Sequence, residues 1–207
     1  MDLSAPLATL IPSLDAGTLA ALAATEGTLG VSQIARIAGR GSRAGHLNVL
    51  QRLVEHGLVV AEPASQGFQY RLNREHLLCP SVLEALAVRR VLFERLTARC
   101  VLLDPRPIHV SVFGSFARGE AGPSSDIDLL AVVADDEVDA LTDAFADVTE
   151  AVRRWTGNPC QVVVVGSAHL AELAGRGSPI VAAWHREHIL VTGAPFGALI
   201  GTADPDA

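Results

Sequence analysis

The chain has 207 residues, enough for one large or two small domains, and its 49% hydrophobic content allows a sizeable core and excludes general disorder. A formal net charge of −7 argues against a general nucleic-acid coat. Three widely spaced cysteines, the lack of a basic leader and the lack of an apolar run of membrane-spanning length predict a cytoplasmic protein with no membrane association.

The first third of the chain has the pattern of three helices followed by a hairpin. Apolar residues recur at helical spacing in three segments, and two short apolar strands follow. Ser13, Ser32 and Ser42 stand where helix-capping residues are expected, and Ile34 and Ile37 are expected to face inward. The expected elements are helices at 14–25, 31–38 and 42–56 and strands at 58–61 and 68–72.

This order is that of a winged helix-turn-helix, and residues 31–72 resemble that family, particularly in the run LVEHGLVV. The resemblance implies that helix 42–56 enters the major groove of DNA. Arginine reads guanine there, and asparagine or glutamine reads adenine. The candidate DNA-binding residues on and before this helix are Arg40, Arg43, His46, Asn48, Gln51 and Arg52.

The charge of this part of the chain keeps a second interpretation open. Residues 1–76 contain six arginines and six acidic residues, whereas DNA-binding domains usually carry a basic surplus. A protein-interaction role, including formation of a homodimer, is therefore the alternative to DNA binding.

A long helical pattern at 81–103 connects the two halves of the chain. Pro80 suits its start, and Asp104 and Pro105 suit its end. We interpret it as a bridging helix at the beginning of a second domain. The predicted domains are therefore 1–76 and 77–207.

The segment GSFARGEAGPSSDIDL, from Gly114 to Leu129, lies between the apolar runs 108–113 and 129–134. Asp126 and Asp128 are two residues apart, so a strand presents both carboxylates on one side. Carboxylate oxygens suit Mg²⁺, which also takes phosphate oxygens from a substrate. The pair is therefore a predicted metal site.

The beginning of this segment has the residues of a phosphate-binding turn. Gly114 permits close approach of backbone to a phosphate, and Ser115 and the following amides can donate to its oxygens. Arg118 adds a charged donor, and Gly119 permits the next turn. The structural alternative is a polar hairpin whose Ser-Asp pair opens a strand.

The whole segment resembles the GSx10DxD signature of the minimal nucleotidyltransferases of the DNA polymerase beta superfamily, through Gly114, Ser115, Asp126 and Asp128. The resemblance covers the chain from Ile108 onward. It implies an NTP substrate, one or two Mg²⁺ ions and transfer of a nucleoside monophosphate to a hydroxyl. It also implies an α+β fold: a winged helix-turn-helix domain followed by a mixed sheet with flanking helices.

The remaining pattern fits such a sheet. The run CQVVVV at 160–165 is continuously apolar, as expected of a strand covered on both faces. The other expected elements are helices at 136–156, 167–174 and 179–188, an edge strand at 189–192 and then a frayed tail.

One position departs from the signature. Related transferases place a third acidic residue on the strand beside the two aspartates, as a metal ligand and base, and the matching residue here is Gln161. An amide oxygen is a weak Mg²⁺ ligand and takes no proton at neutral pH. His169, His185 and His188 are possible substitutes for the missing base.

Two functions follow from these residues. The first is a nucleotidyltransferase with Asp126, Asp128 and Gln161 in its catalytic site, whose acceptor is a protein such as a toxin partner, a small molecule or an RNA end. The second is a weak or inactive transferase fold that serves as a nucleotide-sensing transcriptional regulator or an antitoxin-type interaction module.

Overall fold

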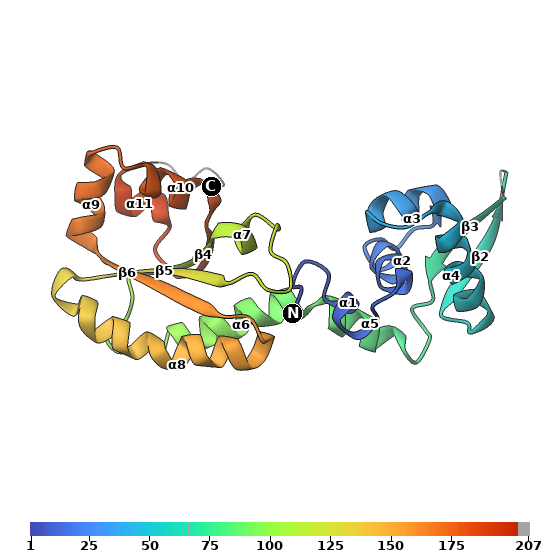
Figure 1. The fold of residues 1–207 in the computed structure, drawn as a ribbon, viewed down its shortest axis with the longest axis horizontal. Coiled ribbons are helices and arrows are strands. Elements are labelled where there is room, and N and C mark those ends of the chain that lie inside the picture. Colours follow the sequence, from blue (N-terminus) through green and yellow to red (C-terminus); the bar gives the residue numbers. More distant parts are fainter. Residues whose placement is uncertain (66, 203–207) are drawn as a thin grey trace. The chain divides into compact units, whose positions relative to one another are not determined.

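The computed structural model describes residues 1–65 and 67–202, which form two compact units. The N-terminal unit contains Asp2 and residues 4–88, and the C-terminal unit contains Met1, Leu3 and the chain from Arg89 onward (Figure 1). The division falls later in the chain than the predicted boundary after His76. Within the described residues, no helix has the length and apolar character needed to cross a membrane.

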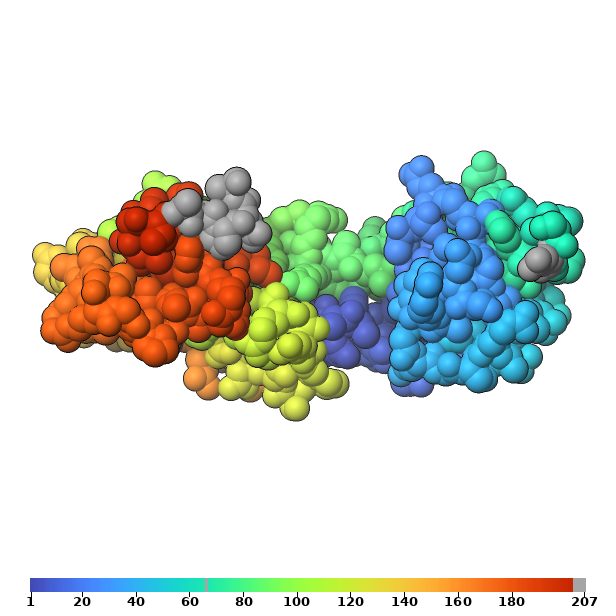
Figure 2. All heavy atoms as spheres, turned by 90° about the horizontal axis from the view of Figure 1, so that it is seen from above, coloured from blue at the N-terminus to red at the C-terminus, as the bar shows by residue number. Residues whose placement is uncertain are grey.

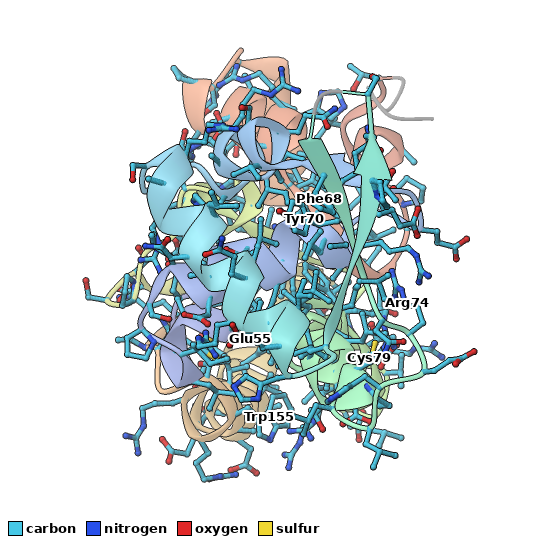
Figure 3. All side chains as sticks on the ribbon, turned by 90° about the vertical axis from the view of Figure 1, so that its right-hand side faces the viewer. Glu55, Phe68, Tyr70, Arg74, Cys79 and Trp155 are labelled. Carbon is cyan, nitrogen blue, oxygen red and sulfur yellow. The ribbon has the colours of Figure 1, made fainter. Side chains whose placement is uncertain are left out.

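The N-terminal unit confirms the winged helix-turn-helix architecture. Its three-stranded antiparallel sheet has the order β1-β3-β2, and β2 and β3 form the wing. Tyr70 is buried and Phe68 is exposed, although both lie on the same side of β3 (Figure 3). The elements are α1 (Leu7–Leu10), α2 (Leu14–Ala23), β1 (Leu29–Gly30), α3 (Val31–Ala38), α4 (Arg43–Glu55), β2 (Val59–Ala64), β3 (Gly67–Leu72) and α5 (Cys79–Leu86).

Short-range capping fixes where these helices begin. Ser13 Oγ accepts a hydrogen bond from the Asp15 amide, and Ser42 Oγ accepts one from the Gly45 amide, as predicted. The predicted cap at Ser32 is wrong, because α3 begins after Gly30. The two isoleucines of α3 also differ, since Ile34 is buried while Ile37 is exposed rather than inward-facing.

The predicted bridging helix is two helices, α5 and α6 (Val88–Cys100), which meet at Ala87. Cys79 and Val82 of α5 pack in the core of the N-terminal unit. Leu92 and Leu96 of α6 pack in the core of the C-terminal unit. The apolar residues of α5 and those of α6 therefore belong to different cores. The continuous helical periodicity of residues 81–103 does not show this division.

The C-terminal unit is built on a four-stranded mixed sheet with the order β6-β5-β4-β7. Strand β4 pairs antiparallel with β5 and β7, and β5 pairs parallel with β6. The elements after α6 are β4 (His109–Phe113), α7 (Gly114–Ala117), β5 (Ile127–Val133), the 3-10 turn η1 (Asp135–Glu137), α8 (Val138–Thr156), β6 (Cys160–Gly166), α9 (Ser167–Gly175), α10 (Pro179–Glu187), β7 (Ile189–Gly193) and α11 (Phe196–Ile200).

Helices cover both faces of this sheet (Figure 1). Alternate residues of β5 pack in two clusters, one with α6 and α8 and the other with α9, α10 and α11. Strand β6 is an edge strand with exposed Gln161 and Val163, so the prediction of a strand covered on both faces is wrong. The predicted edge strand β7 is confirmed. The chain beyond it forms α11, and the last part of the predicted frayed tail lies outside the described residues.

Two glycines of the C-terminal unit provide a test of this packing. Both have positive φ, +93° at Gly193 and +71° at Gly201, but a Cβ would strike the Ile108 backbone only at Gly193. Gly201→Ala should cost about 1 kcal/mol of unfolding free energy through left-handed strain. Gly193→Ala should cost about 2–5 kcal/mol, because overpacking adds to that strain. Urea unfolding of both variants would show equal losses if β4 and β7 were not closely paired.

Candidate active site

The two aspartates of the signature lie at the beginning of β5. Ile127 and Leu129 point into the core beneath α6 and α8, so alternation directs Asp126 and Asp128 toward the opposite face. In the register of the sheet, Asp128 stands beside Phe113 of β4 and Gln161 of β6. Both aspartates are partly exposed. The structure therefore places the two carboxylates on one side of the sheet, at the end that meets α7.

The turn from β4 into α7 fits closely against Asp128. Gly114 has φ = +73°, and a Cβ there would lie 2.7 Å from Asp128 Oδ2. Both observations require glycine, because other residues rarely adopt this conformation and the space is already filled by the carboxylate. The glycine of the signature thus brings the backbone of the turn directly to the metal-binding candidate.

The charges at this site are unbalanced. Burial, and then the nearby carboxylate of Asp126, raise the pKa of Asp128 above its ordinary value. Gln161 Nε2 donates a hydrogen bond to Asp126 Oδ2 over 3.0 Å. An uncharged amide is therefore the hydrogen-bonding partner of one acid, and two negative charges remain close together.

This donor set fits Mg²⁺. Hard carboxylate oxygens on one face, with excess negative charge, are what a magnesium ion takes from a protein when substrate phosphates complete its ligands. Residues 1–65 and 67–202 contain no cluster of three or more His, Cys, Asp or Glu side chains placed to hold a metal. Asp126 and Asp128 would therefore hold the ion as a pair.

The phosphate-binding candidates have different surroundings. Ser115 is half-buried in the first turn of α7, and Gly119 has φ = +73° in the exposed loop that follows (yellow-green, Figure 2). Arg118 donates to Glu120 over 2.8 Å and to Glu187 over 2.6 Å. These two glutamates raise the pKa of Arg118 and engage Nε and Nη1 of its guanidinium. A phosphate that binds Arg118 must therefore use the remaining N–H groups of the guanidinium or replace one of these glutamates.

Glu187 is a residue near the site that the sequence did not indicate. It lies at the end of α10, 69 positions after Arg118, and only the packing of α10 beside α7 brings it there. The contact of Arg89 with α7 was not predicted either: its guanidinium lies 4.9 Å from the centroid of the Phe116 ring. Neither contact has a signal in sequence spacing, since both are long-range.

The three histidines considered as substitute bases have other contacts. His169 lies 3.7 Å from Glu172 on its own helix. His188 Nδ1 lies 3.0 Å from the carbonyl oxygens of Trp184 and His185. The rings of His185 and His188 both pack against Phe196. These contacts support structural roles for the three side chains.

The candidate DNA-binding residues are only partly available. Arg43, Asn48 and Gln51 are exposed on α4. His46 is fully buried, with Nε2 2.8 Å from the Arg40 carbonyl and Nδ1 2.9 Å from Thr18 Oγ1, so its predicted place on the exposed face is wrong. The two remaining candidates are engaged: Arg40 donates to the Ser13 carbonyl, and Arg52 is paired with Asp15.

Residues 95–175 match the family model described as "Nucleotidyltransferase domain". The C-terminal unit therefore contains a nucleotidyltransferase domain, as the signature and the mixed sheet indicated. No curated protein matches the chain.

One solved structure with a similar chain is described as "TrmBL2, an archaeal chromatin protein" with "a novel mode of DNA binding". The alignment covers 84% of this chain and 72% of that one, with 14% identity and a TM-score of 0.28. That score is below the level at which two chains share a fold.

The unbalanced carboxylates predict a dependence of stability on pH. Because the pKa of Asp128 is raised in the folded protein, the protonated carboxyl favours the folded state. This contribution to the free energy of unfolding is complete below the unfolded pKa and is lost as the pH rises through the folded pKa. Asp128→Asn should therefore unfold at a higher temperature than the wild type at pH 7 in a metal chelator. The gain should disappear below pH 3.8, the ordinary pKa of the group.

Asp147→Asn, at an exposed site on α8, is the matched control and should leave the midpoint unchanged. Added Mg²⁺ should raise the midpoint of the wild type but not that of Asp128→Asn. A lower midpoint for Asp128→Asn at pH 7 would contradict the cost assigned to the buried charge of Asp128 and its repulsion by Asp126.

Proposed function

We propose that the chain is a Mg²⁺-dependent nucleotidyltransferase that transfers a nucleoside monophosphate from an NTP to a hydroxyl acceptor. The observation that carries this proposal is the fit of Asp128 against the bare Cα of Gly114. Inside a nucleotidyltransferase domain, it brings the carboxylate pair and the turn that would bind phosphate to one point of the sheet, which supports the proposal. Phosphoryl and nucleotidyl transfer depend mainly on such positioning and on charge neutralisation.

The residues have distinct roles in this proposal. When bound, Mg²⁺ supplies the positive charge that neutralises the triphosphate. Asp126 and Asp128 hold the ion, and Gly114 lets the backbone of the turn approach the phosphate oxygens. Ser115 Oγ donates to those oxygens, and Arg118 adds a charged donor to them.

Gln161 sets the limit of this chemistry. It occupies the register position beside Asp128 and donates to Asp126, so it helps to orient that carboxylate. It takes no proton from an acceptor hydroxyl at neutral pH. The site therefore lacks the third carboxylate that would serve as a base, and intrinsic transfer should be slow.

The presence of Gln161 where a base is expected also favours a second function. A transferase fold that binds NTP without efficient transfer fits a nucleotide-sensing regulator or an antitoxin-type interaction module. The winged helix-turn-helix of the N-terminal unit would supply DNA contacts through Arg43, Asn48 and Gln51, which share the exposed face of α4. A homodimer or a toxin partner is compatible with either function.

Substitution at position 161 separates the two functions. Gln161→Glu restores a base beside the acids and should raise the transfer rate about a hundredfold, the usual contribution of a general base. The measurement is incorporation of label from α-labelled NTPs with Mg²⁺ into partner proteins, RNA or the chain itself. Asp126→Asn and Asp128→Asn should each abolish incorporation.

Gln161→Asn is the matched control, because it keeps an amide and should stay at the wild-type rate or below it. Binding of Mg²⁺–NTP without incorporation by either the wild type or Gln161→Glu would contradict the transferase and favour the sensor. If the chain is a nucleotide sensor, Asp128→Asn should still lose NTP binding.

DNA binding by α4 is tested separately. Arg43→Ala removes an exposed cation from the face that would enter the major groove, and should weaken specific binding about tenfold or more. Gel shifts with DNA from upstream of the coding region provide the measurement. Arg176→Ala, an equivalent charge change directly after α9 of the C-terminal unit, is the control. Equal effects of the two changes would indicate unspecific electrostatic binding.

A further inference from the structure

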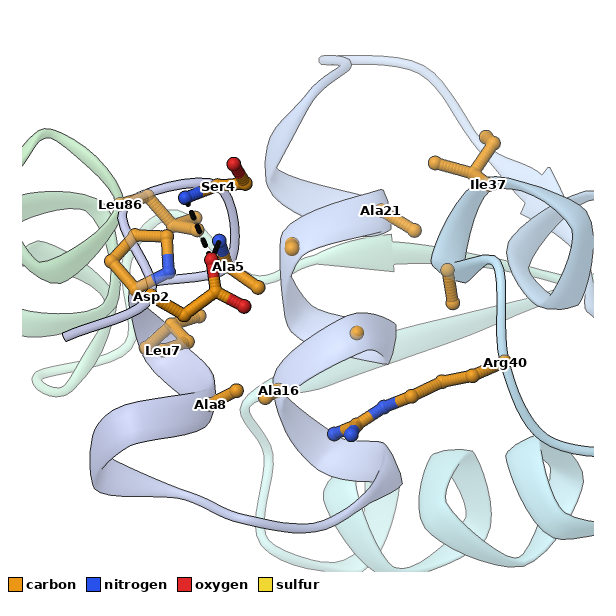
Figure 4. A pocket seen from close by; sticks show the side chains of 14 residues that line it. Asp2, Ser4, Ala5, Leu7, Ala8, Ala16, Ala21, Ile37, Arg40 and Leu86 are labelled. Atoms are coloured by element: carbon orange, nitrogen blue, oxygen red, sulfur yellow. Dashed lines mark hydrogen bonds between the residues drawn. The ribbon is translucent and has the colours of Figure 1, made fainter. Parts of the chain in front are cut away.

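The N-terminal unit contains a pocket that neither proposed function uses. Its volume is about 350 Å³, within the range of about 300–1,000 Å³ typical of small-molecule sites. It lies among the first residues of the chain, α1, α2 and the end of α3 (Figure 4). All of its lining residues belong to this one unit.

Small side chains create this space. Its walls include Ala8, Ala16, Gly17, Ala20 and Ala38, none of which extends beyond a methyl group. A Cβ on Gly17 would lie 3.1 Å from that of Ala38, so α2 and α3 are already in close contact at this point. Ile37, expected in the core, is instead 51% exposed and lines the pocket. An apolar body of a ligand would cover these surfaces.

Two opposite charges face the same space. The Asp2 carboxylate accepts hydrogen bonds from the amides of Ser4 (2.9 Å) and Ala5 (3.1 Å), both through Oδ1. Arg40 uses Nη2 to donate to the Ser13 carbonyl over 2.6 Å. Across residues 1–65 and 67–202, neither Asp2 Oδ2 nor Arg40 Nη1 has a hydrogen-bond or ion-pair partner.

Figure 4 shows these two side chains reaching toward the pocket from opposite sides, with Ala8 and Ala16 between them. An anion alone would be repelled by Asp2, and a cation alone would be repelled by Arg40. A molecule with both charges and an apolar body satisfies each side. We infer that the pocket binds a small aliphatic zwitterion, of which an aliphatic α-amino acid is the simplest form.

The pocket is linked to α4 through one residue. The Arg40 carbonyl accepts a hydrogen bond from Nε2 of the buried His46, over 2.8 Å, in the first turns of α4. The other ring nitrogen of His46 lies 2.9 Å from Thr18 Oγ1 on α2, the helix that lines the pocket. A ligand that engages Arg40 therefore acts on the segment that positions α4. Its effect on DNA rests on the proposed DNA-binding function.

Isothermal titration calorimetry of the full chain with L-leucine tests the site directly. 4-Methylpentanoate lacks only the ammonium group of leucine and isoamylamine lacks only the carboxylate, so each should bind about tenfold more weakly, the usual effect of losing one charge-assisted hydrogen bond. Arg40→Gln and Asp2→Asn should each weaken L-leucine binding by a similar factor. Ala8→Leu should abolish it by filling the pocket.

Arg36→Gln is the matched control, because this exposed residue of α3 does not line the pocket, and it should bind L-leucine as the wild type does. Absence of heat with millimolar L-leucine, or binding that Arg40→Gln and Asp2→Asn leave unchanged, overturns the assignment. The titration contains neither NTP nor DNA, so such a failure leaves the proposed function intact. If the chain binds L-leucine but no DNA, the assignment of the pocket stands, and control of DNA binding by the ligand is excluded.

Discussion

The contact between the Asp128 carboxylate and the bare Cα of Gly114 is the constraint on which the catalytic half depends. The carboxylate fills the place that a Cβ would take. It reaches that place because β4 and β5 pair in a register that sets Phe113 beside Asp128, one residue before the glycine. A shift of one residue would turn both aspartates into the core.

The electrostatics of the site have the same origin. Burial places a carboxylate where its charge is costly, and Asp126 adds repulsion. The nearest charged donor in sequence, Arg118, is held by Glu120 and Glu187 and so is not directed to the acids. The hydrogen bond from Gln161 is neutral. The protein thus leaves negative charge uncompensated, which is the condition under which a divalent ion and a polyphosphate stabilise a site together.

In the N-terminal unit, a winged helix is combined with polar contacts that point inward. His46 and Arg40, two of the residues that suggested a DNA-reading surface, instead connect α4 to the segment before it and to α2. What remains on the exposed face of α4 is a short row of polar residues with one arginine, Arg43, that has no ion-pair partner among residues 1–65 and 67–202. The alanine-rich walls between α1, α2 and α3 leave open space, because residues that end at Cβ cannot fill the gaps between helices.

The sequence alone determined the features that depend on local spacing. The helix caps at Ser13 and Ser42, the order of the strands along the chain, the glycine turn and the two aspartates on one pleat all follow from nearest neighbours or from a period of two. Tertiary structure decided the rest: the division of 81–103 between two cores, the edge position of β6, the burial of His46, the exposure of Ile37 and the capture of Arg118 by Glu187. Each of these joins segments distant in sequence, and their packing is fixed only when the elements come together, because periodicity says which residues share a face but not which surface that face will meet.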